Sequence, residues 1–563
     1  MYSSKENVNV LTALLVTHDV RHVVVCPGSR NAPIVHNLNE CPDITCYPVT
    51  DERSAGFYAL GMAQATLSAV AVCVTSGTAL LNLAPAVAEA YYQHIPLVVI
   101  SADRPQQWID QLDGQTLPQS DALGRFVRKA VSLPEPHDEE ERWYCQRMVQ
   151  EALIVCDGPV HINVPISEPL FEFTESELPS VRRIQKFYRS DSPELLTNTV
   201  FPSFLCVHRP MIVFGQMSSG GMMGDIKHLQ RHAVVLYESL FCRNQSPVHF
   251  DEVLYAHGDN PALLPDCVIY IGGTLVSKRL KQFLRRASDA TFIRVSSDGN
   301  LVDTFMHLDY LVEGEASELL GKLDDCCQRG SFLDEVSEKD VPIADTTRYV
   351  SLWNSLLQQA ASHAESYEPA YSQMMAVRCL EHELQGMNRM TYKVHYANSS
   401  AVRLANIYAH HHVWCNRGVN GIEGSLSVAA GYSITVETDP ITICVIGDLS
   451  FFYDQNALWN QNLNGNLRIL LLNNGKGGIF NMLKGLEKSP ARDHLVAASH
   501  DTSAEGSCRQ NDVGYRKATD EDSLQQGIEW LLYSESERPL LLEVLTDVNQ
   551  DECVFRDYYR ELK

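Results

Sequence analysis

The stretch ITICVIGDLSFFYDQNALWNQNLNGNLRILLLNNGKGGIF, residues 441–480, holds two apolar runs that each end in polar residues. The first run ends at Gly447-Asp448 and the second at Asn473-Asn474. The 26 positions between Asp448 and Asn474 suit one strand–helix–strand crossover. Because ligands gather at the carboxyl ends of parallel strands, we expect both side chains on one rim of a sheet.

The chemistry of these two side chains favours a metal site. A carboxylate and an amide carbonyl are hard oxygen donors, which suit a Mg²⁺ ion that completes its shell with phosphate oxygens and water. Glycines at 475, 477 and 478 would let the backbone approach a diphosphate closely. Two ordinary turns are the better interpretation of either half alone, and only the combination indicates a metal–diphosphate site. GKGG is not a Walker loop, since the GxxxxGK[ST] spacing is absent.

Alternating apolar runs and helical stretches extend this pattern over the whole chain and predict an α/β fold with parallel sheets flanked by helices. Three blocks follow, over residues 1–180, 190–340 and 350–563, with polar stretches at 171–194, interpreted as a linker, and at 330–349. In the first block we expect strands at 22–26, 44–49, 69–75, 96–101 and 160–165, and helices at 52–66 and 79–92. The second block begins with a strand at 211–215.

Composition narrows the class of protein. The chain has 563 residues, of which 45% are apolar and 20% charged, and no apolar run is long enough to span a membrane. The first residues lack the basic stretch of a secretory signal, and the 16 cysteines are scattered as in reducing cytosol, so we expect a cytoplasmic protein. A net charge of −25 argues against general nucleic-acid or anionic-membrane binding.

The GD and NN pair resembles the cofactor motif of the thiamine diphosphate-dependent pyruvate oxidase and decarboxylase superfamily. The resemblance implies thiamine diphosphate with Mg²⁺ or Mn²⁺, bound by Asp448, Asn474 and a backbone carbonyl near Lys476. It also implies a pyrimidine-binding domain at 1–180, a central domain at 190–340 and a diphosphate-binding domain at 350–563. Leu449 departs from the residue that usually follows GD in that superfamily, at a position that binds no metal.

Glu52, in PVTDERSAGF, is the candidate catalytic acid. Alone, a glutamate in a first helical turn usually only complements the helix dipole. The cofactor requires a desolvated acid beside its aminopyrimidine ring, and the resemblance assigns that role to Glu52. In the superfamily the cofactor lies between two subunits, which implies a homodimer or homotetramer with composite sites.

Basic and polar residues follow several strand ends and suit a substrate with several carboxylates. Ser399 and Arg403 are four positions apart, which predicts one helix face. The strings CPGSRNAP, TDERSAGF, SADRP, GIEG, GDLSFFYDQNAL and NNGKGGIF together resemble the 2-succinyl-5-enolpyruvyl-6-hydroxy-3-cyclohexene-1-carboxylate synthase family over nearly the whole chain. Members are transferases of menaquinone biosynthesis that decarboxylate 2-oxoglutarate and add the resulting carbanion to isochorismate.

This narrower resemblance assigns residues to both ligands. The cofactor-binding positions it implies are Glu52, Ile422, Gly447, Asp448, Leu449, Ser450, Asn474, Gly478 and Ile479, with Ile422 as the side chain that keeps the cofactor bent. The substrate-binding positions are Ser29, Arg30, Arg104, Gln115, Lys278, Arg279, Ser399, Arg403, Arg417, Phe480 and Leu483. Which basic residue serves which substrate stays open.

Three alternatives remain at this point. Another thiamine diphosphate enzyme, such as an acetolactate synthase or a 2-oxo acid decarboxylase, would keep Glu52 and the metal pair without needing so many cations. A binding protein with a decayed thiamine fold is disfavoured by the intact metal pair. A Rossmann dehydrogenase built on residues 214–225 is disfavoured because the GxGxxG spacing is missing. The three histidines at 410–412 are interpreted as the end of a helix and the start of a strand.

Overall fold

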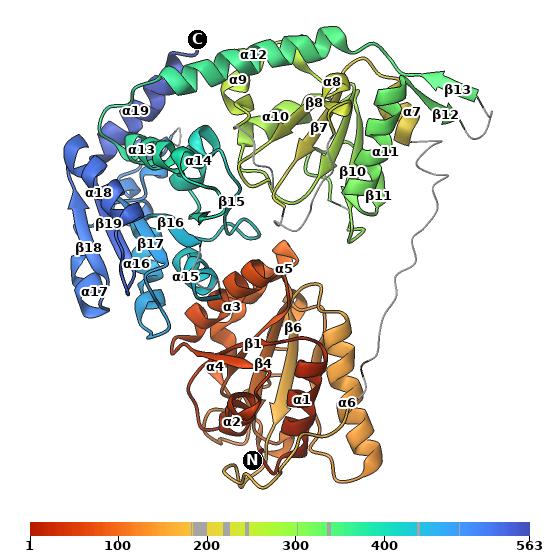
Figure 1. The fold of residues 1–563 in the computed structure, drawn as a ribbon, viewed down its shortest axis with the longest axis vertical. Coiled ribbons are helices and arrows are strands. Elements are labelled where there is room, and N and C mark those ends of the chain that lie inside the picture. Colours follow the sequence, from red (N-terminus) through yellow and green to blue (C-terminus); the bar gives the residue numbers. More distant parts are fainter. Residues whose placement is uncertain are drawn as a thin grey trace.

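A computed structural model describes the chain apart from residues 182, 184–199, 218–225, 242–246, 301, 335–338, 436–439 and 483–484. It contains three parallel sheets flanked by helices, which confirms the predicted fold class (Figure 1). The sheets lie at 22–165, 210–313 and 392–545, one within each predicted block. The domain boundaries themselves stay a prediction.

The first sheet has six strands in the order β2-β1-β3-β4-β6-β5, all parallel. All five predicted strands are present, and β5 is an additional one that sequence reasoning did not identify. The predicted helix 79–92 is two helices, because Pro85 cannot donate the hydrogen bond that would continue the first one. The elements are β1 His22–Val25, β2 Thr45–Pro48, β3 Val70–Val74, β4 Leu97–Asp103, β5 Ala130–Ser132, β6 Val160–Pro165, α1 Glu6–Thr17, α2 Ala32–Glu40, α3 Glu52–Thr66, α4 Thr78–Asn82, α5 Ala84–Gln93, η1 Gln106–Trp108, η2 Gly124–Phe126 and α6 Glu139–Ile154.

The second sheet has five parallel strands in the order β11-β10-β9-β7-β8. Within the polar stretch 330–349, β12 and β13 form an antiparallel pair. Most of the predicted linker 171–194 lies outside the described residues. The elements are α7 Phe201–Leu205, β7 Pro210–Phe214, α8 Leu229–His232, β8 Val234–Tyr237, α9 Phe250–His257, η4 Pro261–Leu263, β9 Cys267–Ile271, α10 Lys278–Arg285, β10 Thr291–Ser296, β11 Leu308–Glu313, α11 Ala316–Arg329, β12 Ser331–Asp334 and β13 Lys339–Pro342.

The third sheet has six parallel strands in the order β15-β14-β16-β17-β19-β18. The long helix α12 leads into it and packs Tyr349, Val350 and Trp353 into the core of the middle domain. The elements are α12 Thr347–Ser366, α13 Gln373–Gly386, β14 Tyr392–Tyr396, α14 Ser400–Tyr408, β15 Val413–Trp414, α15 Ser425–Thr435, β16 Ile441–Gly447, α16 Asp448–Tyr453, η5 Gln455–Leu458, β17 Leu467–Asn473, η6 Gly478–Met482, η7 Leu486–Lys488, a π-helical turn Arg492–Val496, α17 Glu505–Gln510, β18 Gly514–Ala518, α18 Glu521–Tyr533, β19 Leu540–Leu545 and α19 Val548–Arg560.

The first and third sheets share one strand order. If the strands of each are numbered from the first, both read second, first, third, fourth, sixth, fifth. In the first sheet the chain adds β2 on one side of β1 and then β3 on the other side, and in the third sheet it adds β15 and then β16 on opposite sides of β14. Ligands of open α/β sheets bind outside the carboxyl ends of the strands at such a switch point. The fold therefore marks one rim in each of these two domains as a binding edge.

Helices α3 and α15 join the first and third domains (Figure 1). Glycines allow the close approach: a Cβ on Gly61 would lie 2.1 Å from the carbonyl oxygen of Val428, and one on Gly431 would lie 2.3 Å from that of Tyr58. The phenol of Tyr58 is fully buried and donates a 2.7 Å hydrogen bond to the Ala457 carbonyl. The contact between α3 and α15 therefore fixes the first and third domains against each other. Among the described residues, no helix is both long and apolar enough to cross a membrane.

Candidate active site

The carboxyl ends of β14, β16 and β17 bring the predicted cofactor residues to the switch point of the third sheet. β16 pairs with both of its neighbours, and Gly447 lies opposite Leu472 in β17. Asp448 is the first residue of α16 and Asn474 directly follows β17, so the expected crossover is present. Ser399 follows β14 on the same rim. The two halves of the 441–480 stretch thus meet at one rim of the sheet.

The Asp448 carboxylate is buried and surrounded by donors. One oxygen accepts from the backbone N–H of Leu449 at 2.7 Å. The other accepts from the N–H groups of Asn474 at 3.2 Å and Gly475 at 2.8 Å. Burial raises the pKa of Asp448, and the backbone hydrogen bonds and His500, whose ring nitrogen lies 3.5 Å away, counter that rise. The carboxylate therefore has a fixed direction and favours a nearby cation.

The turn after β17 fits a metal and a diphosphate. Gly475 has φ +77°, a backbone conformation that glycine adopts without strain. The Asn474 side-chain amide donates a 2.9 Å hydrogen bond to Asp551, which leaves its oxygen for other partners. The Lys476 side chain pairs with Asp493 at 3.0 Å, and its ammonium has no lone pair for a metal, so its backbone carbonyl is the candidate ligand. The donor set of carboxylate, amide oxygen and carbonyl is the one that Mg²⁺ prefers.

The neighbouring predicted residues lie around this turn. The Ser450 hydroxyl donates a hydrogen bond to the carbonyl of Ile422, which ties the segment bearing Ile422 to α16. The Ile422 side chain is 42% exposed in the single chain. A Cβ on Gly477 would lie 2.9 Å from the Phe480 ring, so the ring packs closely against this glycine. Gly478, Ile479 and Phe480 form the start of η6, and Leu483 lies outside the described residues.

Glu52 is the first residue of α3, and Asp51 caps that helix through the N–H of Ser54. Burial raises the pKa of Glu52, as a proton-relaying acid requires. The start of α3 contacts the segment after α16 in the same chain: Arg53 donates to the Tyr453 carbonyl, and Asn456 donates to Asp51. Among the hydrogen bonds and ion pairs of the described residues, none links Glu52 to Asp448 or Asn474.

Four predicted substrate residues gather where the middle and third domains meet. Arg417 donates to the Asn398 side chain at 3.0 Å and to the carbonyl of Leu275, just ahead of α10, at 3.4 Å. Burial lowers the pKa of Arg403, with Arg417 adding to the effect. Arg279 ion-pairs with Asp251 and stacks over Tyr559. Lys278, the first residue of α10, is exposed.

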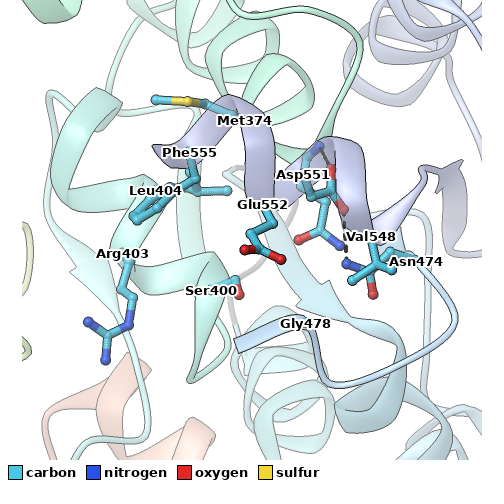
Figure 2. A pocket seen from close by; sticks show the side chains of 11 residues that line it. Met374, Ser400, Arg403, Leu404, Asn474, Gly478, Val548, Asp551, Glu552 and Phe555 are labelled. Carbon is cyan, nitrogen blue, oxygen red and sulfur yellow. Dashed lines mark hydrogen bonds between the residues drawn. The ribbon is translucent and has the colours of Figure 1, made fainter. Parts of the chain in front are cut away.

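The expectation that Ser399 and Arg403 share one helix face is wrong for Ser399. Helix α14 begins at Ser400, and Ser399 precedes it with φ +77°. A side chain at that φ is strained, so the turn between β14 and α14 is held by its surroundings. Ser400 and Arg403 line a pocket with Asn474 and Gly478, closed on one side by residues of α19 (Figure 2). The complete lining is Gln373, Met374, Ser400, Arg403, Leu404, Asn474, Gly478, Val548, Asp551, Glu552 and Phe555.

Four further predicted substrate residues lie at the binding edge of the first sheet. Arg30 is buried, donates to the Ile166 carbonyl at 3.0 Å and pairs with Glu168 at 2.9 Å. Arg104 pairs with Asp113 at 3.0 Å, in the loop that leads to Gln115. Gln115 has φ +59° and packs against the backbone of Gly77, and Ser29 is exposed after β1. No interaction between described residues joins this group to the cations at the middle junction.

Sequence reasoning missed two side chains that the structure adds. Lys281 is half-buried, and burial together with Arg417 lowers its pKa, so it belongs to the junction cations. Its position one turn along α10 from Lys278 could have indicated it. Asp551 contacts Asn474 and lines the pocket. Asp551 could have been predicted only from the strand order, because β19 pairs with β17 and the residues after both strands share one rim.

Comparison with known proteins agrees with this geometry. A family described as "Thiamine pyrophosphate enzyme, N-terminal TPP binding domain" matches residues 6–123. Curated proteins named 2-succinyl-5-enolpyruvyl-6-hydroxy-3-cyclohexene-1-carboxylate synthase are similar over the full chain. The relative from Bacteroides thetaiotaomicron is 43% identical over 100% of both chains, and that from Phocaeicola vulgatus 41% over 100% of this chain and 99% of its own. One from Porphyromonas gingivalis is 34% identical over 99% and 97%. The chain therefore belongs to the 2-succinyl-5-enolpyruvyl-6-hydroxy-3-cyclohexene-1-carboxylate synthase family of thiamine pyrophosphate enzymes.

Proposed function

We propose that this chain catalyses the reaction for which its relatives are named: decarboxylation of 2-oxoglutarate and conjugate addition of the resulting carbanion to isochorismate, in menaquinone biosynthesis. The observation that carries the proposal is the Asp448–Asn474 pair at the switch point of the third sheet, beside a pocket that contains Arg403. Other thiamine enzymes share the pair. The junction cations favour substrates that carry several carboxylates.

We assign the ligands to residues by their chemistry. Asp448, the Asn474 side-chain oxygen and the Lys476 carbonyl would hold Mg²⁺ or Mn²⁺ and, through it, the diphosphate. Thiamine diphosphate, when bound, supplies the electron sink for decarboxylation of a 2-oxo acid. Glu52 holds and returns a proton at the aminopyrimidine ring, a role that its raised pKa supports. Phe480 and Ile422 provide apolar walls that exclude stray proton donors.

The predicted substrate-binding residues form two groups. Arg403, Arg417, Lys278 and Lys281 are among the cations that meet at one junction of the third and middle domains. Arg279 contributes through its ion pair with Asp251, which holds its guanidinium in place. Ser29, Arg30, Arg104 and Gln115 occupy the equivalent edge of the first sheet. We propose that both groups face the substrates once two subunits associate.

The resemblance to the thiamine diphosphate superfamily implies a composite site between two subunits. Such a site is also supported by apolar side chains of the first and third domains' junction region that the single chain leaves uncovered. Val419 is 48% exposed, Ile422 42% and Trp459 56%. Free cysteines support a cytoplasmic location, because none of those that the structure describes forms a disulfide.

A substrate assay tests this function. Purified protein with thiamine diphosphate and Mg²⁺ is given 2-oxoglutarate and isochorismate together, 2-oxoglutarate alone, or pyruvate alone, and carbon dioxide release and product mass are followed. We expect the condensation product only from the pair. Turnover of pyruvate without any use of isochorismate would contradict the proposal and favour an acetolactate synthase or a simple 2-oxo acid decarboxylase.

A further inference from the structure

Asp551 makes a set of contacts that the proposed chemistry has not yet used. It lies in the first turn of α19, just beyond the end of β19. One carboxylate oxygen accepts from the Asn474 side-chain nitrogen at 2.9 Å and from the Thr546 hydroxyl at 2.8 Å. The other accepts from the backbone N–H of Gln373 at 2.8 Å. Figure 2 shows the Asp551 carboxylate directed at the Asn474 amide.

These contacts decide which end of the Asn474 amide faces the turn. An ionised carboxylate only accepts hydrogen bonds, whereas a side-chain amide has a donor end and an acceptor end. The NH₂ group of Asn474 must therefore face Asp551, and its oxygen points away. That oxygen lies 3.4 Å from the N–H of Lys476, on the side of the Gly475–Lys476 turn. Only the oxygen can bind a cation.

The orientation is fixed because Asp551 cannot turn. Its two oxygens are held by donors from three different elements: the turn after β17, the residue after β19, and the start of α13. Space for the amide is also limited, since a Cβ on Gly478 would lie 3.0 Å from the Asn474 nitrogen. We infer that Asp551 is a positioning residue that holds the Asn474 oxygen toward the metal. This inference rests on the metal site proposed above.

The isosteric variant Asp551→Asn should reverse the orientation of the Asn474 amide. Gln373 N–H still needs an acceptor, so the new NH₂ group faces Asn474 and Thr546. The Thr546 hydroxyl can rotate to accept, and the Asn474 amide can rotate so that its oxygen accepts as well. Asn474 then presents NH₂ to the metal. Loss of an outer partner of a metal ligand typically weakens metal binding about 10-fold to 100-fold.

Exchanging the two side chains restores an oxygen. In the double variant Asn474→Asp with Asp551→Asn, the amide introduced at position 551 donates to one oxygen of the carboxylate introduced at position 474, and the other oxygen of that carboxylate faces the metal. Charge and volume are the same as in the wild type. A merely structural role for Asp551 predicts no such recovery, because the exchange repeats the change at position 551. Asp557→Asn is the matched control, since it lies on the same helix and touches no predicted metal ligand.

The experiment measures Mn²⁺ affinity by electron paramagnetic resonance of free Mn²⁺ with thiamine diphosphate present, along with the melting temperature of each cofactor-free protein. We expect Asp551→Asn to bind Mn²⁺ about tenfold or more weakly, the exchanged pair to recover most of that loss, and Asp557→Asn to match the wild type. Asp551→Asn binding within about twofold of wild type, or an exchanged pair as weak as Asp551→Asn, would overturn the inference. Wild-type protein that bound no Mn²⁺ would instead reject the proposed metal site.

Discussion

The backbone N–H of Gly475 donates a 2.8 Å hydrogen bond to the Asp448 carboxylate, although 27 positions separate the two residues. The N–H of Asn474 donates to the same oxygen at 3.2 Å. The end of β16 and the turn after β17 therefore form one unit before any ligand arrives. A site whose parts are already in place binds its ligand without first having to order them.

This unit predicts the effect of Asp448→Asn. The amide removes the charge that attracts the metal and directs an NH₂ group at one of the backbone donors. We expect Mn²⁺ and thiamine diphosphate binding to weaken at least about 100-fold, by the loss of a charged ligand and of its hydrogen bonds. Calorimetric titration of the cofactor measures this. Asp259→Asn, on an exposed side chain of the middle domain, is the control for loss of one charge. Equal cofactor affinity in Asp448→Asn and the control would reject Asp448 as a metal ligand.

The proposed composite site predicts complementation between two inactive variants. Glu52→Gln removes the acid and Asp448→Asn removes the metal ligand. If each site takes one residue from each subunit, a mixed dimer contains one site with both residues intact. Random reassembly of equal amounts then restores about a quarter of wild-type activity, because half of the dimers are mixed and each has one working site of two.

Activity assays after unfolding and refolding the mixture measure this recovery. Each variant refolded alone is the control. If both residues instead came from the same chain, every site in a mixed dimer would lack one of them, so a mixture as inactive as its components would contradict the composite site.

Arg403 should matter more for binding than for turnover. Its side chain lines the pocket that Asn474 also lines, and its guanidinium points away from Asn474 (Figure 2). Its pKa is lowered by burial and by Arg417. A substrate carboxylate would relieve this repulsion. We expect Arg403→Gln to raise KM for 2-oxoglutarate or isochorismate about tenfold or more, with a smaller change in kcat, and Arg403→Lys to recover part of the loss. Steady-state kinetics with each substrate varied in turn measures this. Arg286→Gln is the control, and equal KM values for both glutamine variants would remove Arg403 from the substrate site.

Asp454 predicts a pH dependence of stability. Its fully buried carboxylate accepts from the backbone N–H and the hydroxyl of Ser427, at the start of α15. Burial raises its pKa from 3.8 to about 7. Because the folded pKa lies above the unfolded one, the stabilisation by the protonated form is complete below about pH 3.8 and is lost as the pH rises through 7.

Asp454→Asn cannot ionise and can keep both contacts with Ser427. We therefore expect its melting temperature, relative to wild type, to increase between about pH 5 and 7 and to level off above about pH 7. Differential scanning fluorimetry across this range measures the difference. A difference that stayed constant with pH would show that the Asp454 carboxyl does not titrate in this range.

The sequence was sufficient for features that depend on local pattern. Apolar runs that end in Gly447-Asp448 and Asn473-Asn474 lie on neighbouring parallel strands, so their ends had to meet. Helix α3 has its predicted bounds, since Asp51 is a strong N-cap just ahead of a long helical pattern. Pattern alone did not reveal β5, which has only three residues and one buried side chain.

Partner choice between distant segments could not be predicted. Arg279 and Arg30 looked like free cations, yet they pair with Asp251 and Glu168, whose positions no local pattern connects to them. Asp551 lies 77 positions from Asn474 and follows no recognised motif. Spacing placed Ser399 on a helix, but Ser399 has a positive φ and the helix begins one residue later, at Ser400. Such relations depend on how whole elements pack.

The most direct test of the account is the anomalous scattering of Mn²⁺ in crystals grown with thiamine diphosphate. We predict one strong peak per chain, in contact with the Asp448 carboxylate, the Asn474 side-chain oxygen and the Lys476 carbonyl, with the aminopyrimidine ring of the same cofactor beside Glu52 of a second chain. A bound cofactor whose metal lay away from Asp448 and Asn474 would contradict the interpretation of residues 441–480 as a single metal–diphosphate site.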